Sequence, residues 1–195
     1  MTTAPLFWKG DAGGPKPLAV ALFLAAGLFG IFALTGPVPP GLVGDRQAIL
    51  EGEIWRLFTS HLVHTDFRHL TLNALAVLII APFVGTPRDL GLAILAGMLA
   101  VGLGVLLLQP HIAAYCGFSG VLNTLVVVAL MREWRRAPHW LLAVFLAGVP
   151  AKILYELLAH PLLTEPSWPA LPGAHGFGFV AGVLLALWSG QRIHT

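Results

Sequence analysis

The sequence predicts an all-α fold: a polytopic membrane protein built as a six-helix transmembrane bundle, with an interfacial first loop. Hydrophobic residues make up 57% of the 195-residue chain and charged residues 10%, and the mean hydropathy is +0.82. A water-soluble core needs far less apolar surface. Helices are expected because lipid offers no hydrogen-bond partners to the backbone. A spanning segment must therefore pair its own N–H and C=O groups, within a helix or a closed barrel. A chain of this length holds a single domain, residues 1–195.

Six apolar segments are candidates for spans, since a spanning helix needs about 20 mostly apolar residues. They cover residues 17–35, 68–84, 90–108, 117–131, 139–159 and 174–190. The fourth and sixth are the shortest, and each begins with glycine and a polar side chain, Ser119 or His175. We therefore expect the outer ends of these two helices to lie below the membrane surface, in a water-filled recess.

The N-terminal segment, the net charge and the cysteine content exclude or disfavour several features of the protein. The first apolar run follows Lys9 and Lys16, as in a signal peptide, but it is of span length and lacks a convincing cleavage site, so we expect it to remain as a helix. The net charge of +2 does not favour nucleic acid as a partner. Cys116 is the only cysteine, which excludes an intrachain disulfide.

The basic residues predict the orientation. An inside N-terminus puts seven of the eleven Lys and Arg residues on the cytoplasmic side, namely Lys9, Lys16, Arg88, Arg132, Arg135, Arg136 and Arg192. Three lie outside (Arg46, Arg56 and Arg68), and Lys152 falls within the fifth span. Both termini are then cytoplasmic. The segments that carry His69, Ser119 and His175 all begin near the outer face.

Residues 37–67 form a long segment between the first two spans. It could be an ordinary external loop. We favour a partly helical element in the interface, because Trp55 beside Arg56 suits the headgroup zone. No internal repeat is visible, which counts against an inverted-repeat transporter.

The sequence "GFSG" at 117–120 holds one hydroxyl, that of Ser119, between glycines. Serine at a helix start is often an N-cap. The alternative is a nucleophile, although the glycine that a nucleophile elbow requires two positions later is replaced by Val121. Gly117 and Gly120 would let a substrate backbone approach the hydroxyl closely.

A base for that hydroxyl is available in "GAHGFGFVAG". His175, Gly178 and Gly182 share one helix face, and small residues there permit a neighbouring helix to pack closely. If the neighbour is the fourth span, His175 reaches Ser119. The alternative is a packing or dimerisation stripe with an incidental histidine, although histidines inside membranes are often functional.

His69 and Asn73 lie four residues apart near the outer end of the second span. Acyl transfer develops a negative oxygen, and each donor that stabilises it in a water-poor site contributes about 3 kcal/mol. A metal site using His61, His64 and His69 is the alternative. The spacing fits no helical zinc signature and no carboxylate is suitably placed, so we expect neither metal nor cofactor.

Together these motifs resemble the rhomboid intramembrane serine proteases. The resemblance rests on residues in the family's order: Trp55, Arg56, His64, His69, Asn73, then "GFSG" at 117–120, then Ala174, His175, Gly178 and Gly182. It implies that Ser119 is the nucleophile and His175 the base, without a catalytic acid. It also implies an oxyanion hole of His69, Asn73 and the Ser119 backbone amide.

The resemblance further implies a transmembrane protein substrate in a bacterial inner membrane, with the active site toward the periplasmic side. Substrate-binding or supporting positions would be Gly117, Phe118, Gly120, Asn123, His64, Lys152 and Glu156. Many rhomboids have tyrosine where this chain has Asn123, an amide that could hold the His175 ring by hydrogen bonding instead of stacking. Rival classes are a catalytically inactive rhomboid-like client-binding protein, a small transporter and a glycine-rich structural membrane protein.

Lys152 and Glu156 are spaced i, i+4 in the outer half of the fifth span. One interpretation is a mutually neutralised pair near the interface, with the lysine reaching outward. The other is that the pair helps to bind substrate. With this pair, its small size and the sequence around Ser119, the chain resembles the rhombosortase subgroup. That resemblance implies substrates with a glycine-rich C-terminal anchor and release by hydrolysis or by transfer to an amine.

Overall fold

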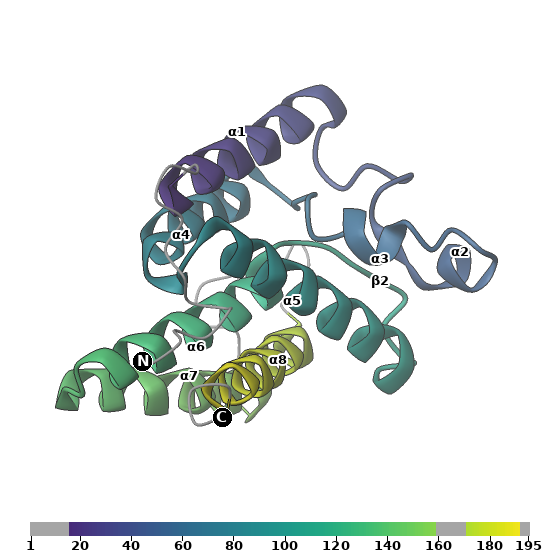
Figure 1. Ribbon diagram of the computed structural model, residues 1–195. Helices are drawn as coiled ribbons and strands as arrows, with labels where there is room; N and C mark the ends of the chain where they lie inside the picture. Colours follow the sequence, from purple (N-terminus) through teal and green to yellow (C-terminus); the bar gives the residue numbers. More distant parts are fainter. Residues whose placement is uncertain (1–15, 159–170, 192–195) are drawn as a thin grey trace.

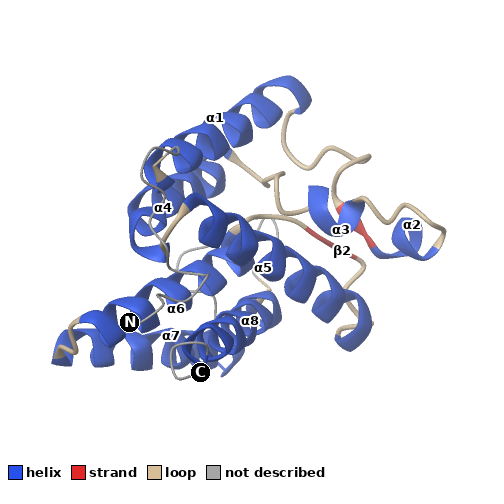
Figure 2. Cartoon of the chain, in the orientation of Figure 1, coloured by secondary structure: helices blue, strands red, loops and turns tan. Residues whose placement is uncertain are grey.

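The protein is a bundle of long helices with a small irregular unit at one side (Figure 1). Figure 1 shows a computed structural model, which describes residues 16–158 and 171–191. Within these residues almost all the regular structure is helical, and the exceptions are two short strands (Figure 2). The predicted all-α bundle is therefore confirmed.

The long helices coincide with the six apolar segments. They are α1 (Pro17–Thr35), α4 (Phe67–Val84), α5 (Pro87–Leu108), α6 (Ser119–Arg136), α7 (Trp140–Leu158) and α8 (Pro172–Gln191). The largest difference from the predicted bounds is in α6, which continues past its apolar run to Arg136. Residue 159, the predicted end of the fifth segment, lies outside the described residues.

Five helices in the described part of the chain are long and apolar enough to cross a membrane: α1, α4, α5, α7 and α8. Helix α6 differs in composition because its last turns carry Arg132, Glu133, Arg135 and Arg136. Its apolar part packs between α4, α5 and α8, and the side chains of Val121, Leu125 and Val128 are buried there. The chain is thus an integral membrane protein with α6 at its centre.

Polar caps fix where two of the spans begin. The Asp66 carboxylate accepts a hydrogen bond from the His69 backbone N–H (2.8 Å) at the start of α4. At the start of α5, Thr86 and Asp89 form a reciprocal capping box. Each cap satisfies helix N–H groups that would otherwise have no partner. The Asp66 cap thereby sets the position of His69 in the first turn of α4.

The first loop forms the small unit beside the bundle. It contains β1 (Gly44–Asp45), α2 (Arg46–Leu50) and α3 (Arg56–Thr59), and β1 pairs antiparallel with β2 (Ala114–Tyr115), just before α6. The loop is therefore partly helical, as we expected.

The interpretation of Arg56 as a headgroup residue is wrong. Its side chain is buried, donates hydrogen bonds to the carbonyls of Pro40 and Val43, and pairs with Glu53. The neighbouring Trp55 is half exposed. Arg56 therefore holds the loop together from inside, because its guanidinium has enough donors to satisfy several carbonyls at once.

Helices α6 and α8 lie side by side, so close that their backbones are in contact (Figure 1). A Cβ atom on Gly178 would lie 1.9 Å from the carbonyl oxygen of Gly120, and one on Gly182 would lie 2.9 Å from that of Thr124. The Thr124 hydroxyl also donates to the Gly178 carbonyl across the interface (2.8 Å). Only glycine permits so close an approach, which is the small-residue packing found between membrane helices.

Candidate active site

The close packing of α6 and α8 brings Ser119 and His175 together. The Ser119 Oγ atom lies 3.0 Å from His175 Nε2, a hydrogen-bonding distance. Ser119 is the first residue of α6 and is half-buried, whereas His175 lies in the first turn of α8 and is 8% exposed. Residues 56 positions apart in the chain thus meet at two helix ends.

The segment before Ser119 is held by the first loop. The Gly117 N–H donates to the Ser60 carbonyl (2.9 Å), and Tyr115 pairs with Gly44 in the two-stranded sheet. Gly117 has a φ of +111°, a conformation that side-chain-bearing residues rarely adopt. The sharp turn there directs the chain into α6.

Ser119 does not cap this helix. Phe118 occupies the cap position, and Ser119 lies inside the first turn. The alternative interpretation of Ser119 as an N-cap is therefore wrong, and its hydroxyl is available to His175.

The second ring nitrogen of His175 contacts a carboxylate from α7. Glu156 Oε2 lies 2.7 Å from His175 Nδ1, and Glu156 Oε1 lies 2.7 Å from Lys152 Nζ. The Glu156 side chain is only 5% exposed, whereas that of Lys152 is 40% exposed. The family resemblance implied no acid here. The structure thus joins Lys152, Glu156, His175 and Ser119 in one hydrogen-bonded chain.

These contacts determine which atom is the donor in each hydrogen bond of the series. A carboxylate only accepts hydrogen bonds, so His175 Nδ1 carries the proton that is donated to Glu156. In the neutral ring Nε2 is then an acceptor and receives the Ser119 hydroxyl proton. The arrangement is the one in which an imidazole can remove a proton from an alcohol.

On α4, His69 lies against the segment before Ser119, and Asn73 is buried about one helical turn further along. A Cβ atom on Gly117 would lie 2.5 Å from His69 Cε1, so the imidazole lies directly against Gly117. The His69 Nδ1 atom is 3.1 Å from the Thr65 hydroxyl. The Asn73 side-chain N–H₂ group is buried and has no hydrogen-bond partner. One nitrogen-bearing side chain therefore lies against the segment before Ser119, and a second, about one helical turn away on α4, has an unpaired buried donor.

His64 and His61 of the first loop are fully buried. The His64 and His69 rings contact edge to face, with centroids 5.0 Å apart. Burial lowers the pKa of His64 to about 3 and that of His61 to about 4, so both are neutral at pH 7. His64 therefore supports His69. Among the described residues no group of three His, Cys, Asp or Glu side chains is placed to hold a metal ion.

Three positions beside Ser119 serve packing instead of substrate access. Phe118 is fully buried, the space beside Gly117 is filled by His69, and that beside Gly120 is filled by α8 and Val101. We expected the two glycines to admit a substrate backbone, and this expectation is wrong because the protein's own atoms occupy the space.

Asn123 also differs from its predicted role. Its side-chain amide donates to the Ser119 carbonyl in the same helix (2.9 Å). Both ring nitrogens of His175 are already engaged, by Ser119 and Glu156. The proposal that the Asn123 amide holds the His175 ring is therefore wrong.

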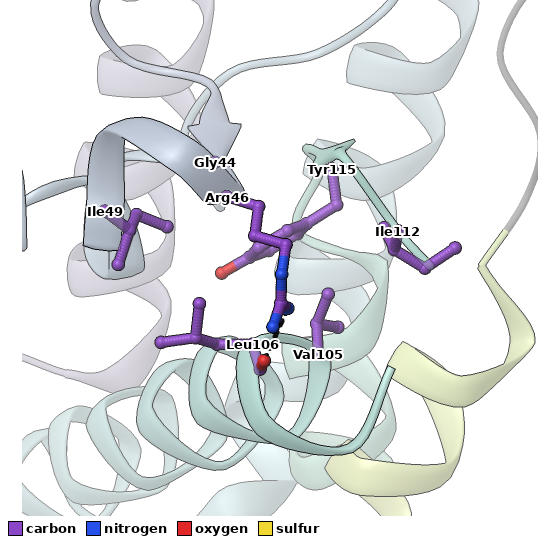
Figure 3. Close-up of a pocket in the computed structure, with 7 residues that line it drawn as sticks. All are labelled: Gly44, Arg46, Ile49, Val105, Leu106, Ile112 and Tyr115. Atoms are coloured by element: carbon purple, nitrogen blue, oxygen red, sulfur yellow. Dashed lines mark hydrogen bonds between the residues drawn. The ribbon is translucent and has the colours of Figure 1, made fainter. Parts of the chain in front are cut away.

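A separate small pocket lies between the first loop and the end of α5 (Figure 3). Arg46 extends across it and donates to the Leu106 carbonyl (2.5 Å), and Tyr115 and Ile112 also line it. None of the side chains of the hydrogen-bonded chain lines this pocket. Arg46 therefore attaches the first loop to α5.

The Rhomboid domain family matches residues 51–192. The chain belongs to the rhomboid family. A relative from Bacillus subtilis (strain 168), named "Putative rhomboid protease YdcA", is 32% identical over 157 residues, which cover 77% of this chain and 75% of the relative. The rhomboid match includes α4, α6, α7 and α8, and hence every residue of the hydrogen-bonded chain.

The sequence pointed to Glu156 as a supporting or substrate-binding residue, but its contact with His175 was missed. The i, i+4 spacing identified Lys152 and Glu156 as a pair, but it gave no reason to orient Glu156 toward α8. The sequence signal that could have identified this contact is the predicted depth in the membrane, because Glu156 and His175 both lie near the outer ends of their segments. An uncompensated carboxylate at that depth needs a partner that can donate hydrogen bonds.

Proposed function

We propose that this rhomboid-family protein is an intramembrane serine endopeptidase. It cleaves a membrane-anchored protein near the outer end of the substrate's transmembrane helix. The observation that supports this most directly is the 3.0 Å hydrogen bond between Ser119 Oγ and His175 Nε2 inside a membrane bundle. A serine with a base in hydrogen-bonding reach is the signature of an activated nucleophile.

The reaction begins when Ser119 Oγ attacks the scissile carbonyl carbon and His175 Nε2 takes the hydroxyl proton. The tetrahedral intermediate collapses, and the C–N bond breaks as His175 returns that proton to the leaving amine. Water then attacks the acyl-enzyme and gives a proton to His175. The ester bond to Ser119 breaks, its oxygen regains the proton, and a new carboxyl terminus is released.

The negative oxygen of each intermediate is stabilised by N–H donors. The Asn73 side chain has a buried donor without a partner, which is the state expected of a group that waits for an anion. The Ser119 backbone N–H belongs to the first turn of α6, where helix amides lack intrahelical acceptors. His69, packed against Gly117, supplies the third donor from Nε2 when its Nδ1 accepts the Thr65 hydroxyl hydrogen, which in the resting protein is donated to Asp66.

The substrate must expose a carbonyl that its helix keeps hydrogen-bonded. Local unwinding is easier where the helix contains glycine, by about 1 kcal/mol for each residue relative to alanine. We therefore propose a substrate with small or helix-breaking residues near its outer end, of which a glycine-rich C-terminal anchor is one instance. The burial of Glu156 and its bonds to Lys152 and His175 disfavour a role in binding a cationic substrate group.

The same proposal includes a location and an orientation. The protein lies in a bacterial inner membrane, with both termini cytoplasmic and the Ser119 end toward the periplasm. The cluster of arginines at the opposite end of α6 supports this, since basic residues favour the cytoplasmic side. One of them, Arg135, also donates to the Ala186 carbonyl of α8 (2.8 Å).

Purified protein in proteoliposomes, with a reporter carrying a glycine-containing transmembrane helix, tests this function. Wild type should release the reporter's outer part, and Ser119→Ala and His175→Ala should not. Ser189→Ala is the matched control, because Ser189 is a buried serine of α8 whose hydroxyl donates to the Ala186 carbonyl of its own helix. Mass spectrometry of the released C-terminus would identify the bond cut and any attached amine.

Two results would contradict the proposal. Equal release by wild type and Ser119→Ala would remove Ser119 as the nucleophile. Reporter binding without cleavage by the wild-type protein would favour the client-binding alternative, and solute flux in the same vesicles would favour the transporter.

A further inference from the structure

A two-residue Ser–His mechanism assigns no role to the Glu156 carboxylate of α7. It lies 2.7 Å from His175 Nδ1 and is held on its other oxygen by Lys152. We propose that Glu156 is a positioning residue for His175, and that Lys152 fixes Glu156 in place. This inference rests on the proposed function of Ser119 and His175 and extends it to a hydrogen-bonded triad.

Glu156 first acts on the tautomer and orientation of the imidazole. A neutral histidine can carry its proton on either ring nitrogen. With the proton on Nε2, the ring could not accept the Ser119 hydroxyl proton, and the serine would stay inactive. Because Glu156 accepts the hydrogen bond from Nδ1, it keeps the proton there and the Nε2 lone pair toward Ser119.

Glu156 also acts on the charge that develops during the reaction. His175 becomes an imidazolium when it takes the serine proton, and this cation forms at a residue only 8% exposed. A carboxylate 2.7 Å away stabilises the cation at the moment it forms. In the resting state the Lys152 ammonium balances the carboxylate, so the group of three side chains carries no net charge.

The surroundings of Glu156 argue against a purely structural role. In α7 (Trp140–Leu158), Ile153 and Glu156 are the buried residues, and the rest of the helix is largely exposed on the surface of the bundle. Stability alone would favour an apolar side chain at such a position, because replacing a buried ion pair by hydrophobic residues is often neutral or stabilising. The carboxylate therefore serves His175.

Glu156→Gln tests the role with little change in shape. Cleavage of the transmembrane reporter should show kcat reduced by about 10²-fold or more, in line with the loss of a triad carboxylate, while KM stays within about twofold. Glu156→Asp keeps the charge and should recover part of the lost kcat. Glu133→Gln is the matched control, since Glu133 pairs with Arg136 on the surface of α6 and should behave as wild type.

Lys152→Met/Glu156→Gln provides a second variant that leaves no unpaired ammonium in the span. It should show the same reduced kcat as Glu156→Gln. Wild-type kcat in either variant, or a loss confined to KM, would overturn the inference. So would failure of both variants to accumulate in the membrane, because the carboxylate would then be structural. These outcomes differ from failure of the proposed function, in which wild-type protein itself would not cleave, or would cleave without Ser119.

Discussion

Two interfaces of α8 hold His175 in contrasting ways. Against α6 the contact is backbone to backbone, where Gly178 faces the Gly120 carbonyl and leaves no room for a side chain. Against α7 the contact is made by side chains, chiefly the hydrogen bond of Glu156 and the looser packing of Ile153, 3.9 Å from a Cβ placed on Gly176. The first interface is fixed by main-chain geometry, and the second depends on a charged hydrogen bond.

The difference shows what each interface contributes to the position of His175. The distance from Ser119 to His175 follows from helix packing, which tolerates no added volume. The contact with Glu156 depends on a helix whose other residues are largely exposed, so it can be weakened without displacing Ser119. Added volume in the α6–α8 interface should therefore abolish activity, and loss of the hydrogen bond to Glu156 on the α7 side should reduce it.

The largest effect is expected for Gly178→Ala. The added methyl group would lie 1.9 Å from the Gly120 carbonyl oxygen, so α6 and α8 must separate. Overpacking in well-packed interiors costs about 1–3 kcal/mol or more, and here the obstacle is backbone. We expect reporter cleavage to be lost and the thermal unfolding temperature in detergent to fall.

Gly176→Ala is the matched control on the α7 side of the same helix. Its methyl group would meet only Ile153 at 3.9 Å, an ordinary contact. Cleavage within about twofold of wild type is expected, and alanine raises helix propensity. Equal damage from the two substitutions would contradict the contrast between the interfaces.

Asn73→Ala should have the next largest effect, without disturbing either interface. The substitution removes a buried donor that has no partner in the resting protein. We expect kcat to fall by about 10²-fold with little change in KM, because the donor is used only when the oxyanion forms. Steady-state cleavage kinetics provide the measurement. A rise in KM at constant kcat would instead assign Asn73 to substrate binding.

The first loop allows a pH test outside both interfaces. The folded-state pKa values of His64 (about 3) and His61 (about 4) lie below the ordinary 6.5, so the folded protein binds fewer protons than the unfolded chain. Above pH 6.5 both histidines are neutral in the folded and in the unfolded protein, so they make no contribution to a pH dependence of stability there. Below it, the free energy of unfolding should fall by about 1.4 kcal/mol per pH unit for each histidine, until the pH reaches the folded pKa.

Thermal unfolding in detergent between pH 7.5 and 4.5 measures this dependence. His61→Gln keeps a donor for the Met98 carbonyl and should remove about half of the slope. His111→Gln, at an exposed position, is the control and should leave the slope unchanged. A wild-type unfolding temperature that does not change over this range would show that these two histidines are not buried in the neutral form.

Thr124→Val should have the smallest effect. It removes the hydroxyl that donates to the Gly178 carbonyl across the α6–α8 interface and keeps the side-chain shape. A loss of about 1 kcal/mol in the free energy of unfolding is expected, the usual net value of one hydrogen bond. Thr71→Val is the control, because its exposed hydroxyl bonds only within α4. Equal losses would mean that the interhelical bond adds nothing.

The sequence predicted the helices well, because spans are specified locally by apolar length. The meeting of Ser119 and His175 could also be anticipated, since glycine spacing on one helix face indicates where a neighbouring helix approaches. Arg56, Phe118 and Asn123 were misjudged, because their partners are main-chain carbonyls or core residues that local patterns do not identify. Glu156 was missed as a partner of His175 because the relative rotation of α7 and α8 depends on tertiary packing.

The central claim is that His175 activates Ser119 within the bilayer. A serine-directed fluorophosphonate probe applied to membranes measures this activation directly, without any need for the natural substrate. We expect rapid labelling of Ser119 in wild type and at least about 10²-fold slower labelling in His175→Ala, with both proteins folded to the same extent. Equal labelling rates in the two proteins would contradict the account.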